Sequence, residues 1–430
     1  MTMVASRYIY NKVVELSDKL IRQPILAKFL EMYSKDSKAY KFVVGHARTA
    51  VKIHTGVRRD NVVWTHVSSL GELAVVRPVI KELRSKYGKH VVLTFFSPSG
   101  YEASVPYLGT SYADADEIYY MPIDTWKNAC RFIDVIKPQL VIFAISEIWP
   151  NYLEELRKRN VPTYIVSAKI TGKSSICKPY GGLIRDSYKC FTHIACLNKE
   201  SKDILLRYGI KNVSIIGDPL FDNAIAISRK EYENVVIQRF CEGNYVFIAG
   251  SIHDKTDLEM VSYLANANPD DKFIFVPHEI HEEILNQIKY HLEGACLLYS
   301  ECDENTDFSD IQVLVIDFLG ALSRIYRFCR YAYVGGGFTP YLHSVIEATV
   351  YGLPVAFGPR IERKVTPLQM VEMGIGKIVT NGSELDKWYK SLRRDDKILE
   401  QTKLLAERYT SQNAGATRSI VEMVLNHGGE

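Results

Sequence analysis

The segment NVVWTHVSSLGELAVVRPVIKELRSKYGKHVVLTFFS, residues 61–97, decides the fold. It opens with a short apolar run and continues through a Ser-Ser-Leu-Gly-Glu turn into a helical segment at 72–87, which leads to a second apolar run. Short apolar runs separated by helices are typical of a parallel sheet that is covered on both faces. The segment therefore predicts the first two strands of an α/β domain.

The same alternation continues along the chain and restarts once. Runs such as QLVIFAI, PTYIVSA and HIACLN alternate with helical segments up to a pause at 222–243, and NYVFIAGS, KFIFVPH, VLVID and YAYVGGG follow that pause. Two such halves predict two Rossmann-like domains, 61–225 and 226–400, with parallel sheets that face a central cleft. Ligands of such sheets bind beyond the carboxyl ends of the strands.

The composition argues against several classes of protein. No apolar run of about 18 residues occurs, so no membrane-spanning helix is expected, and the N-terminus lacks the apolar centre of a secretory signal. The eight cysteines have neither a common zinc spacing nor a thioredoxin-type spacing. We expect reduced thiols in a cytoplasmic protein that has no nucleic-acid partner.

Positive charge is concentrated in the first 60 residues. This segment carries 12 Lys and Arg against 5 Asp and Glu, a balance of +7, whereas the whole 430-residue chain has a net charge of only +3. Apolar residues between Ile9 and Leu30 recur at roughly helical spacing. A basic amphipathic segment over 1–60 fits attachment to an anionic membrane surface. The alternative is a solvated helix that packs on the domain.

Ser69 and Glu72 lie at the turn between the first strand and the first helix. Their spacing is that of a capping box, in which Ser69 is the N-cap and Glu72 the third helical residue. The functional alternative makes Glu72 a general base at a strand end, kept ionised at pH 7 by the helix N-terminus. We expect Ser69 to cap the helix while the Glu72 side chain turns toward the cleft.

A second candidate site follows the strand in YVGGGFTPYLHSVIEATVYGLPVAFGP. The strand ends in three glycines, 335–337, and a helix expected from about Tyr341 would offer backbone N–H groups to an anion. On that helix His343 and Glu347 would share a face, with His343 near a phosphate or sugar acid and Glu347 accepting ribose hydroxyls. The pattern is neither G-x-G-x-x-G nor a P-loop. The alternative is a tight glycine turn before an ordinary helix.

Two more strand-end loops complete the candidates. His278 and Glu279 follow a strand in VPHEIHEE, but with His281 they do not form H-E-x-x-H, and no third ligand stands out, so no metal site is expected. In VLVIDFLGALSRIY a strand runs into a helix through Gly320, and backbone groups at this turn could read the edge of a base. A plain strand–helix loop is the alternative there.

Together these motifs resemble those of the 3-deoxy-D-manno-octulosonic acid (Kdo) transferases of lipopolysaccharide assembly, particularly the versions from bacteria of the Bacteroides type. The resembling stretches are HVSSLGE, LTFFSPSGYE, EIWPNYLEELRKRNVPTYIVSA, GDPLFD, VPHEIHEE, VLVIDFLGALSRIYRF and YVGGGFTPYLHSVIEATVYGLPVAFGP. They occur in the family order and cover residues 60–380.

The resemblance implies a GT-B glycosyltransferase fold, in which a C-terminal helix over 401–430 crosses back onto the first domain. It implies an inverting transfer of Kdo from CMP-Kdo to a lipid A precursor, with Glu72 as the base and with no metal or other cofactor. It assigns the cytidine nucleotide to His278, Glu279, Leu319, Gly320, Ala321, Ser344, Val345, Ile346 and Glu347. The motif pattern adds Gly335, Gly336, Gly337 and His343 to the expected substrate site.

The chain departs from the family pattern at two positions. Many relatives carry a charged residue where this chain has Ile145 and a basic residue where it has Leu220, and both are thought to assist the transition state. Many also begin with an apolar anchor. Here the basic segment is expected to hold the enzyme peripherally on the cytoplasmic face of the inner membrane. Two alternatives stay open: a GT-B enzyme for another sugar nucleotide, and a degenerate sugar-nucleotide-binding protein without catalysis.

Overall fold

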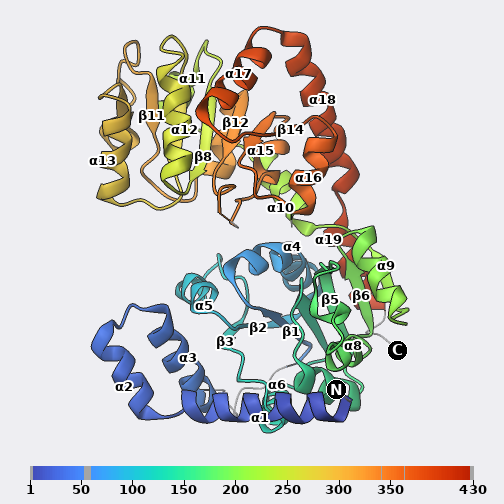
Figure 1. The fold of residues 1–430 in the computed structure, drawn as a ribbon. Coiled ribbons are helices and arrows are strands. Elements are labelled where there is room, and N and C mark those ends of the chain that lie inside the picture. Colours follow the sequence, from blue (N-terminus) through green and yellow to red (C-terminus); the bar gives the residue numbers. More distant parts are fainter. Residues whose placement is uncertain (1–2, 53–59, 340, 363, 427–430) are drawn as a thin grey trace. The chain divides into compact units, whose positions relative to one another are not determined.

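The computed structural model describes residues 3–52, 60–339, 341–362 and 364–426. The chain divides into two compact units, of which the first contains 1–222 and 415–430 and the second contains 223–414 (Figure 1). The sequence placed the junction at 225/226 and the returning segment at 401–430. In the structure the junction lies at 222/223, and the chain returns to the first unit only at residue 415.

The first unit is built on a seven-stranded parallel sheet in the order β3-β2-β1-β4-β5-β6-β7. Every residue of the central strands β1, β4 and β5 is buried, as expected for a sheet covered on both faces. The strands are β1 (Val62–Val67), β2 (His90–Phe95), β3 (Glu117–Tyr120), β4 (Leu140–Ala144), β5 (Thr163–Ala168), β6 (His193–Cys196) and β7 (Val213–Ile215).

Helices cover both faces of this sheet. On one face Leu73 of α4 and Ile420 of the returning α19 pack over Val63, and on the other face Phe132 and Tyr152 pack around Trp64. The helices are α4 (Leu70–Tyr87), α5 (Pro98–Ser104), η1 (Val105–Tyr107), α6 (Trp126–Ile136), α7 (Pro150–Lys158), η2 (Ser175–Cys177), α8 (Gly182–Tyr188), α9 (Lys199–Arg207) and α19 (Ala416–Asn426). The two cores hold the carboxyl end of β1, and thus the start of α4, in place.

Three helices precede the sheet: α1 (Met3–Ile21), α2 (Pro24–Tyr33) and α3 (Lys38–Lys52). They belong to the first unit, along one side of which they run in blue in Figure 1. The Tyr10 hydroxyl donates a 2.5 Å hydrogen bond to Asp124, and Arg7 pairs with Glu154. Helix α1 is therefore packed on the domain, although a row of apolar side chains on α1 and α2 stays exposed.

The second unit repeats the plan with a parallel sheet in the order β10-β11-β9-β8-β12-β13-β14. Its strands are β8 (Phe247–Ile252), β9 (Phe273–Pro277), β10 (Cys296–Leu298), β11 (Val313–Val315), β12 (Tyr331–Val334), β13 (Val355–Phe357) and β14 (Gly376–Ile378). Its helices are α11 (Val235–Cys241), α12 (Lys255–Asn266), α13 (Glu282–His291), η3 (Tyr299–Glu301), α14 (Leu322–Ile325), η4 (Tyr326–Phe328), α15 (Ile346–Thr349), α16 (Val365–Glu372), α17 (Gly382–Arg393) and α18 (Asp396–Asn413), and α10 (Pro219–Ser228) spans the junction. Two α/β units with parallel sheets confirm the predicted pair of Rossmann-like domains.

Two further expectations can be compared with the structure. All eight cysteines are free thiols, as their spacing indicated. Among the helices formed by the described residues, none combines the length and the apolar character that crossing a bilayer requires.

Candidate active site

The start of α4 shows how Ser69 and Glu72 share the helix cap. Ser69 is the N-cap, and its hydroxyl accepts a 3.5 Å hydrogen bond from the backbone N–H of Glu72. The Glu72 carboxylate folds back and accepts a 2.5 Å hydrogen bond from the backbone N–H of Ser68, one residue before the N-cap. The cap by Ser69 is confirmed. The Glu72 carboxylate bonds to Ser68 and not to the N–H of Ser69, the contact that would complete the capping box.

The surroundings of Glu72 also change its expected ionisation. Burial raises the pKa of Glu72 to about 8, and the negative charge of Glu147 adds to this rise, while the hydrogen bond from Ser68 opposes it. The helix N-terminus was expected to keep this carboxylate ionised at pH 7. That expectation is wrong because burial and a second carboxylate outweigh the favourable backbone contact.

Glu147 is the second carboxylate of this site, and it lies between β4 and α7. It accepts a 2.8 Å hydrogen bond from the indole N–H of Trp149, and its carboxylate lies 3.3 Å from Nε2 of the buried His66. Burial acts to raise the pKa of Glu147, but contacts with His66, Ser68 and Trp149 outweigh it, and the pKa lies below its usual value. Ser68 therefore hydrogen-bonds to both carboxylates, whose pKa values are driven apart.

Neither His66 nor Glu147 was among the site residues expected from the sequence. His66 opens the stretch HVSSLGE and Glu147 opens EIWP, yet 81 residues separate them. The pairing of β1 with β4 brings them together, since His66 lies opposite Phe143 in the sheet. Acidic or basic side chains at the carboxyl ends of neighbouring strands would have been the signal.

Ile145 and Leu220 provide no charge here. Ile145 follows β4 in the left-handed region at φ 53°, which is rare for a β-branched residue, and its side chain packs against the apolar core. Leu220 is the second residue of α10, and its backbone N–H donates a 3.0 Å hydrogen bond to Asp218. Glu147, two residues beyond Ile145, is the ionised group in this part of the site.

In the second unit the three glycines after β12 form a close-packed turn. A side chain at Gly335 would meet the carbonyl oxygen of Ser251 at 2.2 Å, and one at Gly337 would meet the backbone of Gly358 at 2.6 Å. Gly336 has φ +93° and donates its N–H to Asp257 at 2.8 Å. Protein backbone, rather than open space, therefore surrounds these three positions.

His343 and Glu347 do not share a helix as expected. The predicted helix from Tyr341 begins only at Ile346, because the N–H of His343 bonds to the Gly335 carbonyl at 3.2 Å instead of within a helix. Burial raises the pKa of Glu347 to about 7, and it lowers the pKa of His343 to about 4 with added repulsion from His278 and His253.

The remaining predicted residues lie on the carboxyl edge of the same sheet. His278 and Glu279 are exposed directly after β9, whereas His281 caps α13 through Nδ1. Leu319 is 74% exposed in the turn before α14, where Gly320 has φ +84°. The residues around the short helix α15 divide into exposed and buried side chains: Ser344 is exposed, and Val345 and Ile346 are buried.

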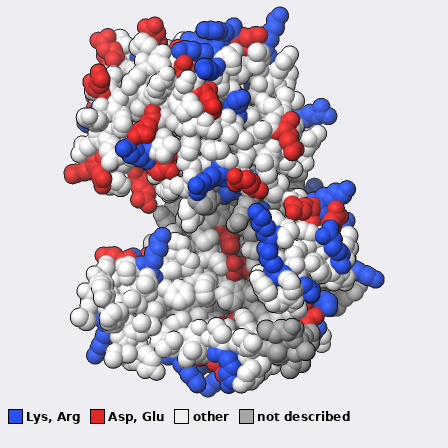
Figure 2. Space-filling model, viewed as in Figure 1, with Lys and Arg blue, Asp and Glu red and all other residues white. Residues whose placement is uncertain are grey.

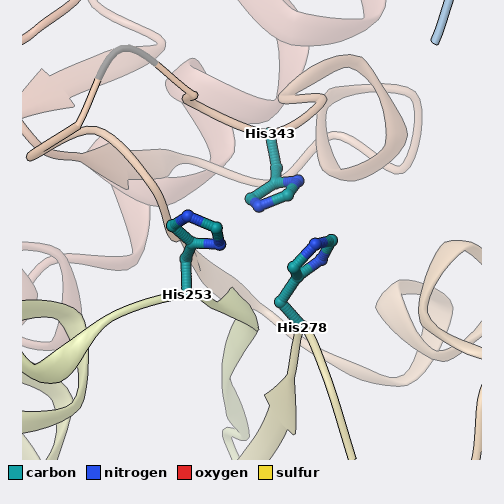
Figure 3. A group of neighbouring side chains, drawn as sticks. All are labelled: His253, His278 and His343. Carbon is teal, nitrogen blue, oxygen red and sulfur yellow. The ribbon is translucent and has the colours of Figure 1, made fainter. Parts of the chain in front are cut away.

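The sheet order brings these loops to one edge. Strands β11, β9, β8 and β12 are consecutive neighbours, so the loops after them are adjacent at their carboxyl ends. His278 and His343, which are 65 residues apart in sequence, have ring centroids 4.2 Å apart. His253, after β8, joins them (Figure 3), although it was not itself expected from the sequence to belong to the site.

Comparison with known proteins agrees with the motifs. Residues 42–223 match a family model described as 3-deoxy-D-manno-octulosonic-acid transferase (kdotransferase). A 3-deoxy-D-manno-octulosonic acid transferase from Haemophilus influenzae is 22% identical over 97% of this chain and 98% of its own length. One from Aquifex aeolicus is 28% identical over 75% of this chain and 83% of its own length.

Two other similarities are more restricted, one in the length that is covered and one to the fold alone. A bifunctional glycosyltransferase/methyltransferase from Fusobacterium nucleatum is 23% identical over 81% of this chain, which spans 56% of that longer protein. Among solved structures, a UDP-GlcNAc 2-epimerase from Neisseria meningitidis bound to UDP-GlcNAc covers 85% of this chain with all of its own, at a TM-score of 0.62 and 16% identity. That likeness concerns the fold alone. The family model and the transferases together confirm the resemblance to Kdo transferases that is seen in the motifs.

Proposed function

We propose that this protein transfers Kdo from CMP-Kdo to a lipid A precursor, with Glu72 as the general base. The observation that carries the proposal is the carboxylate pair after β1 and β4, in which Glu147 is ionised and Glu72 has a pKa of about 8. A base works best when its pKa lies near the working pH. Glu72 is therefore a stronger base than an exposed glutamate, because burial and, after it, the charge of Glu147 raise its pKa.

The reaction is a single displacement with inversion. The acceptor hydroxyl attacks the anomeric carbon of Kdo, the bond from that carbon to the CMP phosphate breaks, and CMP leaves as an anion. The hydroxyl proton passes to Glu72, which must first release the N–H of Ser68 that it holds in this state. No electron is exchanged with a cofactor in this displacement.

The loops at the carboxyl edge of the second sheet are the proposed donor site. Glu279 and Leu319 are exposed there, and the backbone around Gly320 is turned to the left-handed region. We assign the base and ribose of CMP to these loops and to the stretch from Ser344 to Glu347. The packed glycine turn, by contrast, shapes the loop that carries His343 rather than holding the donor itself.

The acceptor is a lipid, and α1 and α2 offer a surface for a membrane. Exposed apolar side chains recur at helical spacing on both: Ile9, Val13, Leu16 and Leu20 on α1, and Ile25, Phe29, Met32 and Tyr33 on α2. The surface over α2 and α3 is largely uncharged at the lower left of Figure 2, although segment 1–60 has a net charge of +7. An apolar row on a basic segment supports peripheral attachment to the anionic inner membrane, on its cytoplasmic face.

The transfer is tested with the purified full chain in detergent. CMP release is followed with CMP-Kdo and lipid A precursor together, with each alone, and with a UDP-sugar in place of CMP-Kdo. The proposal expects release only when CMP-Kdo and the lipid are both present. No release from that pair, or equal nucleotide release from the UDP-sugar, would contradict the assigned substrates.

A further inference from the structure

Three histidines meet at the carboxyl edge of the second sheet. His253 follows β8, His278 follows β9, and His343 lies in the loop after β12, and these strands are neighbours in the order β9-β8-β12. The ring centroids are 5.2 Å apart for His253 and His278, 5.3 Å for His253 and His343, and 4.2 Å for His278 and His343. Figure 3 shows the three rings turned toward a common centre.

The backbone of each histidine is fixed by contacts outside the cluster. The N–H of His253 bonds to the Asp257 carboxylate at 3.0 Å, that of His278 to the carbonyl of Ile252 at 2.9 Å, and that of His343 to the carbonyl of Gly335 at 3.2 Å. Asp257 also accepts the N–H of Gly336 at 2.8 Å. One buried carboxylate thus ties the His253 loop to the glycine turn that carries His343.

The imidazoles, in contrast, have no partners of their own among the described residues. Nε2 of His343 is buried and makes no hydrogen bond. Buried polar atoms without a partner are rare in folded proteins, and a nitrogen in this position is suited to bind an ion or a water molecule. His253 and His278 are exposed, so a ligand can reach the cluster from solvent.

The spacing of the rings fits one metal ion. One nitrogen from each ring can be chosen so that all three lie within 4.8 Å of one another. Zinc-bound nitrogens lie about 2.0–2.1 Å from the ion, which puts them about 3.4 Å apart in a tetrahedral site. Small side-chain rotations would close the difference, because the His253 and His278 side chains are exposed and not held by hydrogen bonds.

The type of ligand identifies the class of ion. Neutral imidazole favours zinc, copper, nickel and other late transition metals, whereas magnesium and calcium favour oxygen. Two charged groups bear on the cluster with opposite sign, since Lys364 acts on His343 and Glu279 acts on His278. The three nitrogen ligands therefore decide the preference.

We propose that His253, His278 and His343 bind one divalent transition-metal ion of the zinc class, with at least one coordination position open to a ligand from solvent. Three protein nitrogens leave a tetrahedral ion with a fourth position for a ligand from solvent. The proposal does not depend on the proposed transfer reaction, because binding of the ion is measured directly.

The test uses the full chain without a histidine tag, freed of metal with a chelator. Cobalt(II) is titrated into the protein at pH 7.5, and its visible absorption bands report coordination by nitrogen in a site of low coordination number. We expect one equivalent of tight binding, displacement by one equivalent of zinc, and a change in the bands when azide is added to the open position.

Single substitutions assign the ligands. His253→Ala, His278→Ala and His343→Ala should each weaken cobalt binding by at least about tenfold, since even the loss of a residue that only orients a metal ligand costs that much. His291→Ala, at the end of α13, is the matched control and should bind as the wild type does. Circular dichroism of the metal-free variants checks that they are folded.

Three outcomes would overturn the proposal. Absence of stoichiometric cobalt binding refutes the site, and so does binding that survives all three substitutions in folded protein. Bands that do not respond to azide refute the open position.

Discussion

At the scale of single residues, Glu72 has a structural contact with the N–H of Ser68 and a proposed chemical role as the base. A glutamate at the third helical position normally serves the cap. Here burial, with the charge of Glu147 added to it, raises the pKa of Glu72 to about 8, so that the side chain holds its proton at neutral pH and releases it at slightly higher pH. In the proposed reaction, the helix contact and the base are two states of one carboxyl group.

This pairing predicts a pH dependence. The base must be deprotonated, so kcat/KM should rise with pH and level off above about 8, where Glu72 is ionised. Glu147→Gln removes a neighbouring negative charge, which lowers the pKa of Glu72 and moves the rising limb to lower pH. The measurement is kcat/KM against pH for CMP release by both proteins.

Glu82→Gln supplies the control for that profile. Glu82 lies on the same helix, paired with Lys86 at 2.8 Å, and its loss should leave the rising limb unchanged. A profile that stays in place in Glu147→Gln, or moves to higher pH, would mean that Glu147 does not set the pKa of Glu72.

At the scale of elements, the apolar rows on α1 and α2 predict a membrane contact. Leu16 is 60% exposed on α1, and Leu16→Glu places a charge in the row that should enter the lipid. We expect its binding to vesicles containing anionic lipid to fall about tenfold or more, because burying a carboxylate in lipid is costly. Co-sedimentation with vesicles measures the effect.

Leu404 on α18 gives a matched control, since it is 63% exposed and lies in the second unit. Leu404→Glu should bind vesicles as the wild type does. Equal loss in both variants, or no loss in Leu16→Glu, would refute the assignment of the surface to α1 and α2.

The attachment of α1 to the first unit can be tested separately. Asp124 is buried and accepts hydrogen bonds from the Tyr10 hydroxyl and from the backbone N–H groups of Asn151 and Tyr152. Tyr10→Phe removes one donor from a buried carboxylate, at a cost of about 1–3 kcal/mol. We expect faster hydrogen exchange in α1, and unchanged exchange there would contradict the anchoring role.

Local features of the site could be predicted from sequence, and features made by topology could not. The Ser69 cap depends on two residues that lie three positions apart, so their spacing in the sequence was sufficient to predict it. Glu147 reaches Glu72 only through the pairing of β1 with β4, and His253 reaches His343 only through the order β8-β12. The helix expected at Tyr341 failed because tertiary bonds to the glycine turn replaced helical ones.

At the scale of the whole molecule, Asp222 secures the place where the chain changes units. Its carboxylate accepts 2.6 Å hydrogen bonds from the N–H groups of Gly415 and Thr417, at the start of the returning helix α19. That helix packs along α4, which carries Glu72. Asp222 is thus the N-terminal cap of the segment that completes the first unit.

Asp222→Ala should release this cap at a cost of about 0.5–2 kcal/mol. We expect amide hydrogen exchange in α19 to quicken by up to about thirtyfold, while Asp203→Ala on the exposed side of α9 leaves it unchanged. Exchange in α19 that is the same in both variants would show that packing alone holds the returning helix.

The central claim is that Glu72 accepts the proton of the acceptor hydroxyl. Its most direct test is the single-turnover rate of CMP release from CMP-Kdo and lipid A precursor for wild type, Glu72→Gln and Glu82→Gln. The account predicts a loss of about 10²–10⁴-fold for Glu72→Gln and a rate near wild type for Glu82→Gln. A Glu72→Gln enzyme that is as fast as the wild type would return Glu72 to the role of a helix cap alone.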